Sequence, residues 1–482
     1  MLARTIIRRA GCKALYQVHR RAYASTALTP EQIKIVQSTI PALETHGVEI
    51  TTLFYRQLLN KHPELKNIFN TAHQDTGEQP AALAHAVWAY AVNIEKPEAM
   101  KAAISRIGHK HASLGVTADQ YPIVGRELLS AIKQILGDGV NSKVLDAWEA
   151  AYGQLAEYFI NFEEGLYQEA MATPGGWKGW RKFFISDKVR ESEEIISFHL
   201  TPTDSGALPS FKPGQFVSIR CFLPELGAYQ PRQYSLSDVP NGKYFQISVK
   251  REFASDMKPA GRVSNVLHEL LPDGSEVDVS MPFGDFVLDI NATTPVVFIS
   301  GGVGLTPMMA MLKKITEEGK PRKVVFIHAA RNSRAHAMKD TLIEIVRDHP
   351  EVTRLVYYER VEEDDILGLD YDHEGRVDLA EVKHKVILPE ANYYICGPPP
   401  FMNSQSKALR DLGVDERHIH MEHLKFQLNP AIPTIPWPGY RDIAMPGSRA
   451  PESTTACAMA DCYVGYKYPD PNTLFFVTPL AV

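Results

Sequence analysis

The stretch that decides the fold of the C-terminal part runs from Pro295 to Pro307 and reads PVVFISGGVGLTP. Its first six residues are typical of a strand that is buried on both faces of a parallel sheet. The glycines that follow allow backbone amides to approach a phosphate group closely. Thr306 and Pro307 are expected to form the N-cap and the first position of a helix at 308–316. The stretch therefore predicts a strand, a phosphate-binding loop and a helix.

The same alternation continues along the chain. Further strands are expected at 323–328, 353–358 and 392–396, with helical stretches between them, which predicts a parallel, doubly wound sheet. The first loop is not the G-x-G-x-x-G fingerprint, and no clear strand-end acid follows about twenty residues later. A second loop, Cys396-Gly397-Pro398-Pro399, follows the last of these strands. We assign residues 292–424 to a nucleotide-binding α/β domain.

Two arginines, Arg331 and Arg334, follow the second strand. A guanidinium at this place suits the 2′-phosphate of NADPH, and a pair of solvated surface charges explains the same pattern equally well. The sequence leaves the choice between NADH and NADPH open.

Residues 174–289 carry a different pattern. The turn-rich run Pro174-Gly175-Gly176-Trp177 marks a boundary, and short β-rich runs such as 216–220 and 244–249 follow it. Their spacing predicts a small antiparallel barrel. Within it, an arginine fork in the run Arg232-Gln233-Tyr234-Ser235 suits a pyrophosphate, and a tyrosine on the same strand face can pack against a flavin ring. A match to these four residues alone is weak evidence for a flavin site, because chance matches of this length are common.

Residues 27–171 are predicted to be all-helical. Thr29-Pro30-Glu31-Gln32 and Thr117-Ala118-Asp119-Gln120 both combine an N-cap with a capping-box glutamine, and the apolar spacing between them is mostly three and four. One stripe at helical spacing comprises Leu83, Val87, Tyr90 and Ile94, with Gln79 one turn before it on the same face.

Three polar residues of this part face apolar stripes. In the helix expected at 101–114, His111 shares a face with Ile104 and Ile107, whereas His109 points elsewhere. A neutral imidazole that faces a core needs a hydrogen bond or a metal, and taken alone a hydrogen-bonded core histidine is the better explanation. Tyr121 and Glu163 lie on separate stripes, and a mutual hydrogen bond would offset the cost of burying the carboxylate.

The first residues differ from all the others. Residues 1–30 contain six arginines and lysines and no acidic residue, and the apolar residues lie on one helical face. This pattern is typical of a mitochondrial transit peptide, with cleavage expected near Tyr23 or Ala24, although a solvated basic arm would share it. Residues 1–26 are therefore left out of the fold, and the mitochondrial matrix is expected, with the cytosol as a second compartment.

The overall composition sets wider limits. The chain has 482 residues, of which 22% are charged and 44% are hydrophobic, and its net charge is −6. An overall positive charge that would favour nucleic-acid binding is therefore absent. No apolar run approaches the length of a membrane-spanning helix. Five cysteines are too few and too scattered for a disulfide scaffold. We expect a soluble multidomain protein, active as a monomer.

The helical part resembles the globin domain of flavohaemoglobins, the nitric oxide dioxygenases. The resemblance rests on Tyr55, the run Pro63-Glu64-Leu65-Lys66-Asn67-Ile68-Phe69-Asn70, Gln79 and Lys110-His111. It implies that His111 is the proximal haem ligand and that Phe69 packs against the haem. It further implies that Tyr55 and Gln79 contact bound oxygen, and that Lys110, Tyr121 and Glu163 tune the iron.

The other two parts resemble the ferredoxin-reductase family. This resemblance assigns the second phosphate-contacting segment to Lys250-Arg251 and Gly261-Arg262-Val263-Ser264-Asn265, and a flavin-lining ring to Phe216. The implied FAD site comprises Phe216, Arg232, Gln233, Tyr234, Ser235, Lys250, Gly261, Val263 and Ser264. The implied nicotinamide site comprises Gly302, Val303, Gly304, Thr306, Pro307, Cys396, Gly397 and Pro398. Glu422 matches a family acid near the flavin.

The tail departs from both families. His423 and Leu424 stand where an aromatic residue against the flavin is expected, unless Phe426 substitutes for it. Residues 425–482 contain nine prolines and little periodicity, which predicts an extended or disordered segment.

Together the resemblances imply an enzyme that oxidises nitric oxide to nitrate with O2, using haem b, FAD and NADH or NADPH. The first alternative is an FAD-dependent reductase whose globin is a sensor of oxygen or nitric oxide. The second is a haem protein without reductase activity, if the altered C-terminus prevents FAD binding.

Overall fold

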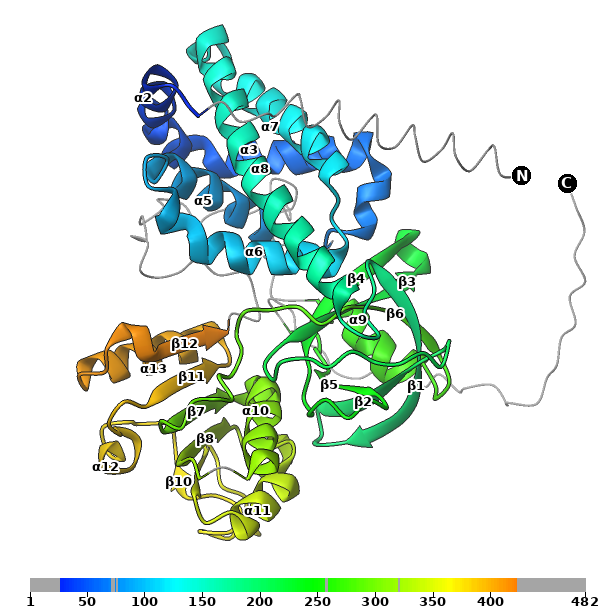
Figure 1. Cartoon of the computed structure of the whole chain (residues 1–482), viewed down its shortest axis with the longest axis vertical. Coiled ribbons are helices and arrows are strands. Elements are labelled where there is room, and N and C mark those ends of the chain that lie inside the picture. The colour runs from blue at the N-terminus through cyan, green and yellow to red at the C-terminus, as the bar shows by residue number, and fades with distance from the viewer. Residues whose placement is uncertain (1–26, 71–73, 75–76, 256–258, 320, 423–482) are drawn as a thin grey trace, which may run out of the picture. The chain divides into compact units, whose positions relative to one another are not determined.

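The computed structural model describes residues 27–70, 74, 77–255, 259–319 and 321–422, which form three successive parts (Figure 1). The expected transit segment (1–26) and the Pro-rich tail (425–482) lie outside the described residues, as do His423 and Leu424. None of the helices within the described ranges is long and apolar enough to cross a membrane.

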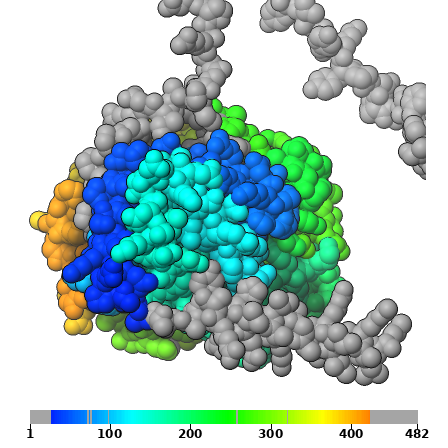
Figure 2. Space-filling model, turned by 90° about the horizontal axis from the view of Figure 1, so that it is seen from above, coloured from blue at the N-terminus to red at the C-terminus, as the bar shows by residue number. Residues whose placement is uncertain are grey.

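The first part consists of helices, as predicted. Both capping boxes form: the Thr29 hydroxyl accepts from the Gln32 backbone while the Gln32 side chain accepts from the Thr29 backbone, and Thr117 and Gln120 do the same. In the space-filling view this part, coloured blue to cyan, forms a continuous surface (Figure 2). Its main helices are α2 (Pro30–Ser38), α3 (Ile40–Lys61), α5 (Glu78–Val92), α6 (Lys101–Leu114), α7 (Tyr121–Leu136) and α8 (Ser142–Ala172), with a 3-10 turn, η1 (Pro63–Asn67), after α3.

The second part is an antiparallel sheet with the order β4-β3-β6-β1-β2-β5. Its strands are β1 (Trp180–Arg190), β2 (Ile195–Pro202), β3 (Phe216–Leu223), β4 (Ala228–Ser235), β5 (Phe245–Lys250) and β6 (Glu276–Ser280). A bridge between Leu236 and Ile247 joins the two end strands, so the sheet closes on itself. Fully buried side chains such as Phe183, Phe198 and Val217 fill the interior, which is how a small barrel forms its core.

The third part is a parallel sheet with the order β10-β9-β8-β7-β11-β12. Its strands are β7 (Val296–Gly301), β8 (Val324–Ala330), β9 (Val352–Tyr358), β10 (His373–Glu374), β11 (Asn392–Cys396) and β12 (Ile419–Glu422). Apolar residues of α10 (Leu305–Glu318) and α11 (Lys339–Asp348) cover one face, and those of α12 (Lys383–Val386) and α13 (Pro399–Asp411) cover the other. The doubly wound prediction is therefore confirmed.

The predicted start of the helix after the phosphate loop is wrong for both Thr306 and Pro307, since Pro307 is the third residue of α10 and not the first. Thr306 is not the N-cap of the following helix, because a 3-10 turn at Gly302–Gly304 brings the chain into helical geometry earlier and α10 begins at Leu305. The Thr306 hydroxyl instead donates to the carbonyl oxygen of Val303 at 3.0 Å, inside the first turn. The helix also extends to Glu318, beyond the expected end at residue 316.

Candidate cofactor and redox site

The centre of the helical part is a three-residue polar contact. His111 lies on α6, Tyr121 begins α7, and Glu163 comes from α8. Nδ1 of His111 is 2.8 Å from Oε1 of Glu163, and the hydroxyl of Tyr121 donates to the same oxygen at 2.6 Å. Glu163 is 3% exposed, so its charge is screened little by solvent. The helical phase correctly placed His111 inward, whereas His109 accepts from the backbone of Gly284 in the barrel.

The electrostatics of this contact define which nitrogen of His111 is available. Burial and the neighbouring carboxylate raise the pKa of Tyr121, so its hydroxyl remains a donor. A carboxylate accepts hydrogen bonds and cannot donate them, so Nδ1 of His111 carries the proton and Nε2 presents its lone pair. A histidine that donates its other N–H to a carboxylate is a more basic iron ligand, so this donor set fits a haem.

A second polar pair lies on α3 and α5. The side chains of Tyr55 and Gln79 are hydrogen-bonded to each other. Burial raises the pKa of Tyr55, and the hydrogen bond from Gln79 opposes that rise. The Tyr55 ring meets Phe69 edge to face, with ring centroids 5.5 Å apart. The structure therefore brings Tyr55, Gln79 and Phe69 together, as the resemblance implies.

Strand β4 presents the predicted flavin motif. Arg232 and Tyr234 share one face of the strand, and Gln233 points to the opposite face. On the opposite face, the Gln233 amide donates to the hydroxyl of Ser218 on β3 at 3.0 Å. Ser235 ends the strand and is buried.

Positive charge gathers around Arg232. Burial lowers the pKa of Arg232, and the neighbouring Arg262 lowers it further. Burial likewise lowers the pKa of Lys110, on helix α6, and the proximity of Arg232 adds to this effect. Because two phosphates would neutralise such a gathering of cations, the chemistry of these side chains fits the pyrophosphate of FAD.

The second predicted phosphate segment is tightly built around Gly261. A Cβ at this glycine, which precedes α9 (Arg262–Asn265), would lie 2.6 Å from the Ser264 hydroxyl and 2.7 Å from Cβ of Glu252, so a larger residue would force these side chains to shift. Val263 is buried in the barrel core. Lys250 is turned to an ion pair with Glu194 at 3.4 Å, and its contact with a flavin stays a prediction.

The two predicted nicotinamide loops touch each other. A Cβ at Gly304 would lie 2.3 Å from the carbonyl oxygen of Cys396 and 2.7 Å from the backbone nitrogen of Gly397, so the chain needs glycine at 304. The loop 302–304 ends β7 and the loop 396–398 ends β11, and these strands are neighbours in the sheet. Parallel strands bind their ligands at the carboxyl edge, where both loops lie.

Glu422 lies beside this edge. It pairs with Cys396 in the β11–β12 register. The pKa of Glu422 is raised from 4.5 to about 8, chiefly by burial and also by nearby Asp285, while Arg106 opposes the rise. The carboxyl is therefore largely neutral at pH 7 and can donate a hydrogen bond.

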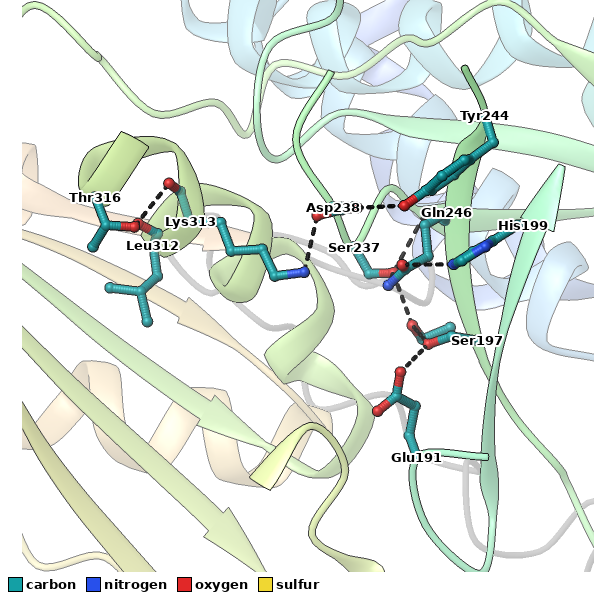
Figure 3. A network of polar contacts seen from close by, with 11 residues as sticks. Glu191, Ser197, His199, Ser237, Asp238, Tyr244, Gln246, Leu312, Lys313 and Thr316 are labelled. Atoms are coloured by element: carbon teal, nitrogen blue, oxygen red, sulfur yellow. Dashed lines mark hydrogen bonds and ion pairs between the residues drawn. The ribbon is translucent and has the colours of Figure 1, made fainter. Parts of the chain in front are cut away.

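A polar network connects the barrel with α10 (Figure 3). Nζ of Lys313 lies 2.9 Å from Oδ1 of Asp238, whose other oxygen accepts from Tyr244 at 3.3 Å. The hydroxyl of Ser237, the residue before Asp238, accepts from the Gln246 amide at 3.1 Å. The network therefore joins the barrel to α10, the helix that begins directly after the loop 302–304.

Sequence reasoning missed the polar residues that join the helical part to the barrel. Ser218 of β3 donates to Ser113 of α6 at 2.7 Å, and Gln230 of β4 donates to the Lys66 carbonyl oxygen at 3.1 Å. These partners are 105 and 164 positions apart, so no local spacing could have marked them.

Comparison with known proteins finds relatives that contain all three parts in a single polypeptide. A globin family model matches residues 52–159, and a model of the oxidoreductase NAD-binding domain matches residues 298–407. Over 395 residues the chain is 50% identical to the flavohaemoprotein of Rhizobium meliloti, a match that covers 82% of this chain and 98% of that protein. It is 46% identical over 387 residues to the flavohaemoprotein of Deinococcus radiodurans, covering 80% of this chain and 94% of that protein.

A solved structure agrees with these relatives. The flavohaemoglobin of Malassezia yamatoensis, crystallised with bound FAD and haem, superposes with a TM-score of 0.74 at 27% sequence identity. The match covers 83% of this chain and 100% of the other.

Proposed function

Because the chain belongs to the flavohaemoprotein family, we propose that it is an NAD(P)H-dependent nitric oxide dioxygenase, which oxidises nitric oxide to nitrate with O2. Its cofactors are haem, FAD and a nicotinamide nucleotide. When bound, FAD supplies the conversion of a two-electron hydride donor into one-electron deliveries, and haem supplies an iron centre that activates oxygen.

The helical part provides the groups around the iron. In this proposal His111 ligates through Nε2, while Glu163 draws on its Nδ1–H and so raises the basicity of the ligand. Tyr121 fixes the position of that carboxylate. On the other side, Tyr55 donates a hydrogen bond toward oxygen, and Gln79 orients the Tyr55 hydroxyl.

The reductase parts provide binding and orientation. Arg232 binds the pyrophosphate of FAD, and Tyr234 packs against its ring from the same face of β4. The loops at 302–304 and 396–398 hold the nicotinamide nucleotide at the carboxyl edge of the sheet. Glu422 faces the same edge as a neutral acid at pH 7.

The observation that carries the proposal is the hydrogen bond between Nδ1 of His111 and Oε1 of Glu163 at 2.8 Å. An electron-rich imidazole favours oxygen activation over reversible oxygen storage. The same chain also contains a complete reductase fold, which can reduce the iron again after each turnover.

The direct test is product analysis with purified protein. We expect two nitrate ions for each NAD(P)H oxidised when nitric oxide and O2 are both present, because each nitric oxide takes one electron together with one O2. A sensor globin on a reductase would bind nitric oxide without producing nitrate in proportion to NAD(P)H, and that result would contradict the proposal. A protein that retains haem but contains no flavin would support the reductase-deficient alternative.

We also propose import into mitochondria, on the basis of the acid-free, arginine-rich residues 1–26. A fluorescent reporter fused to these residues should accumulate in the matrix. The matched control replaces Arg4, Arg8, Arg9, Lys13, Arg20 and Arg21 with glutamine and should stay in the cytosol. Cytosolic fluorescence from the unaltered fusion would contradict the proposal.

A further inference from the structure

A chain of four hydrogen-bonding groups connects the flavin-binding strand to the helix that carries His111. The Gln233 amide donates to the Ser218 hydroxyl at 3.0 Å. Ser218 donates to the Ser113 hydroxyl at 2.7 Å, and Ser113 donates to the carbonyl oxygen of Lys110 at 2.8 Å. That carbonyl belongs to the peptide bond between Lys110 and His111.

In this series of hydrogen bonds, every donor points from β4 toward the Lys110 carbonyl oxygen on α6. Each hydroxyl has one proton, and each gives it to the next group toward α6, so every link polarises its neighbour and strengthens it. Ser218 and Ser113 are 0% and 1% exposed, which excludes bulk water as a substitute partner. Removing either hydroxyl would take one hydrogen-bond partner from the other, which is a buried group.

The location of Ser218 distinguishes it from an ordinary strand serine. Ser218 and Gln233 are direct cross-strand partners on the outer face of the barrel, opposite the face that fills the core. Helix α6 covers this face, and the hydroxyl of Ser218 bridges the two surfaces. Gln233 stands between Arg232 and Tyr234, so the link begins inside the flavin motif itself.

We propose that Ser218 is a positioning residue for the passage of electrons from flavin to haem, because its hydroxyl fixes α6 against β4. The inference rests on the proposed function, since it requires both cofactors in one relay. Transfer of an electron between two centres slows steeply as their separation grows, and it is faster through bonds than through gaps. A link that ends one residue before His111 therefore keeps the path short and its geometry constant.

The decisive comparison uses two isosteric variants of the holoprotein. Ser218→Thr keeps the hydroxyl and Ser218→Val replaces it with a methyl group, while the added methyl is common to both. We expect Ser218→Val to slow haem reduction by NADH about fivefold to tenfold, and Ser218→Thr to restore most of the rate. Haem reduction is followed as formation of the ferrous carbon monoxide spectrum without nitric oxide or O2.

Two further readouts separate positioning from general damage. Reduction of ferricyanide by NADH reports the flavin alone and should stay unchanged in both variants. The fluorescence lifetime of FAD is shortened by a nearby haem, and we expect it to lengthen in Ser218→Val without any turnover. Ser113→Ala removes the same link from the side of α6 and should produce the same selective loss, even if Ser218→Val folds poorly.

A matched control is available elsewhere in the barrel. Ser248 on β5 is buried and contacts the hydroxyls of Ser197 and Ser237 at 2.7 and 2.8 Å, within a serine network of the barrel. Ser248→Ala should leave haem reduction unchanged. The proposal is overturned if Ser218→Val reduces haem at the normal rate, if Thr and Val slow it equally, or if ferricyanide reduction falls in parallel. It is also overturned if Ser248→Ala has the same effect as Ser218→Val.

These outcomes are independent of the proposed activity. Carbon monoxide trapping requires neither nitric oxide nor O2, so a wild-type protein that makes no nitrate would refute the dioxygenase and leave this test intact. Normal nitrate production together with an unaffected Ser218→Val variant would refute the positioning role alone.

Discussion

The hydroxyl of Tyr121 lies 2.6 Å from Oε1 of Glu163, and both side chains are buried. The hydrogen bond holds this carboxylate oxygen in place beside His111. The charge of Glu163 is thereby aimed at Nδ1 of His111, which lies 2.8 Å from the same oxygen. If His111 ligates the iron as proposed, Tyr121 and Glu163 would thus set the electron density of that ligand without touching the iron themselves.

We expect Glu163→Gln to lower nitric oxide consumption about tenfold to a hundredfold, because the neutral amide no longer raises the basicity of His111. The iron–histidine stretching frequency of the reduced protein should also decrease, which resonance Raman spectroscopy would detect. The neighbouring Glu164→Gln is the control, since Glu164 pairs with Lys178 at 3.5 Å on the surface. An unchanged frequency in Glu163→Gln would contradict the assignment.

The hydrogen-bonded pair of Tyr55 and Gln79 gives a second prediction. Tyr55→Phe removes the hydroxyl that Gln79 orients. Oxygen should then dissociate from the reduced protein about tenfold faster, since one hydrogen bond is lost. Stopped-flow displacement by carbon monoxide measures this rate. Tyr90→Phe is the control, because the Tyr90 hydroxyl donates to the Ala151 carbonyl oxygen at 2.9 Å, between α5 and α8, and is not hydrogen-bonded to Tyr55 in the described part of the chain.

Glu422 predicts how stability depends on pH. Its pKa is raised from 4.5 to about 8, chiefly by burial, so between these pH values the folded protein holds a proton that the unfolded chain has released. The free energy of unfolding should therefore fall as pH rises through this interval. Below it both states are protonated, and above it both are ionised.

Glu422→Gln should remove this contribution, since an amide does not titrate. Thermal midpoints of wild type and variant, measured from about pH 5 to about pH 8, would show a smaller decrease in the variant. Glu416→Gln, an exposed carboxylate just before β12, should keep the wild-type profile. Parallel profiles for wild type and Glu422→Gln would show that this carboxyl titrates normally.

The contact between Glu194 and Arg331 predicts a change in nucleotide preference. Arg331 follows β8, a position from which an arginine can bind the 2′-phosphate of NADPH. In the structure its guanidinium is ion-paired with Glu194. Glu194→Gln should free Arg331 and raise kcat/KM for NADPH relative to NADH about tenfold. Glu276→Gln, which breaks the exposed pair with Lys182 at 3.0 Å, is the control. The idea fails if both variants leave the ratio unchanged.

Sequence reasoning succeeded where the deciding physics is local. The phase of one helix was enough to separate His111 from His109, because residues two positions apart differ by more than half a turn. The capping boxes at Thr29 and Thr117 are likewise local, and both form. Four strands of the parallel sheet, β7, β8, β9 and β11, were predicted from their sequence pattern, whereas the short strands β10 and β12 were not predicted.

The features that sequence reasoning did not predict depend on how the preceding turn or a distant segment is placed. Thr306 has the chemistry of an N-cap, yet the 3-10 turn before it had already started the helix. Ser218 resembles any outward-facing serine until α6 is placed over it. The raised pKa of Glu422 arises chiefly from burial and also from Asp285, and neither cause is visible in the residues next to Glu422 in the sequence.

Strand β4 also limits how this chain can diverge during evolution. Gln230, Arg232 and Tyr234 face one way and Gln233 faces the other, so inserting or deleting a single residue would exchange the two sets. Such a change would damage the arginine of the flavin motif, the contact of Gln230 with Lys66 and the link through Ser218 in one event. Changes of length should accumulate instead in the turn at 224–227, which precedes β4 and contributes none of these side chains.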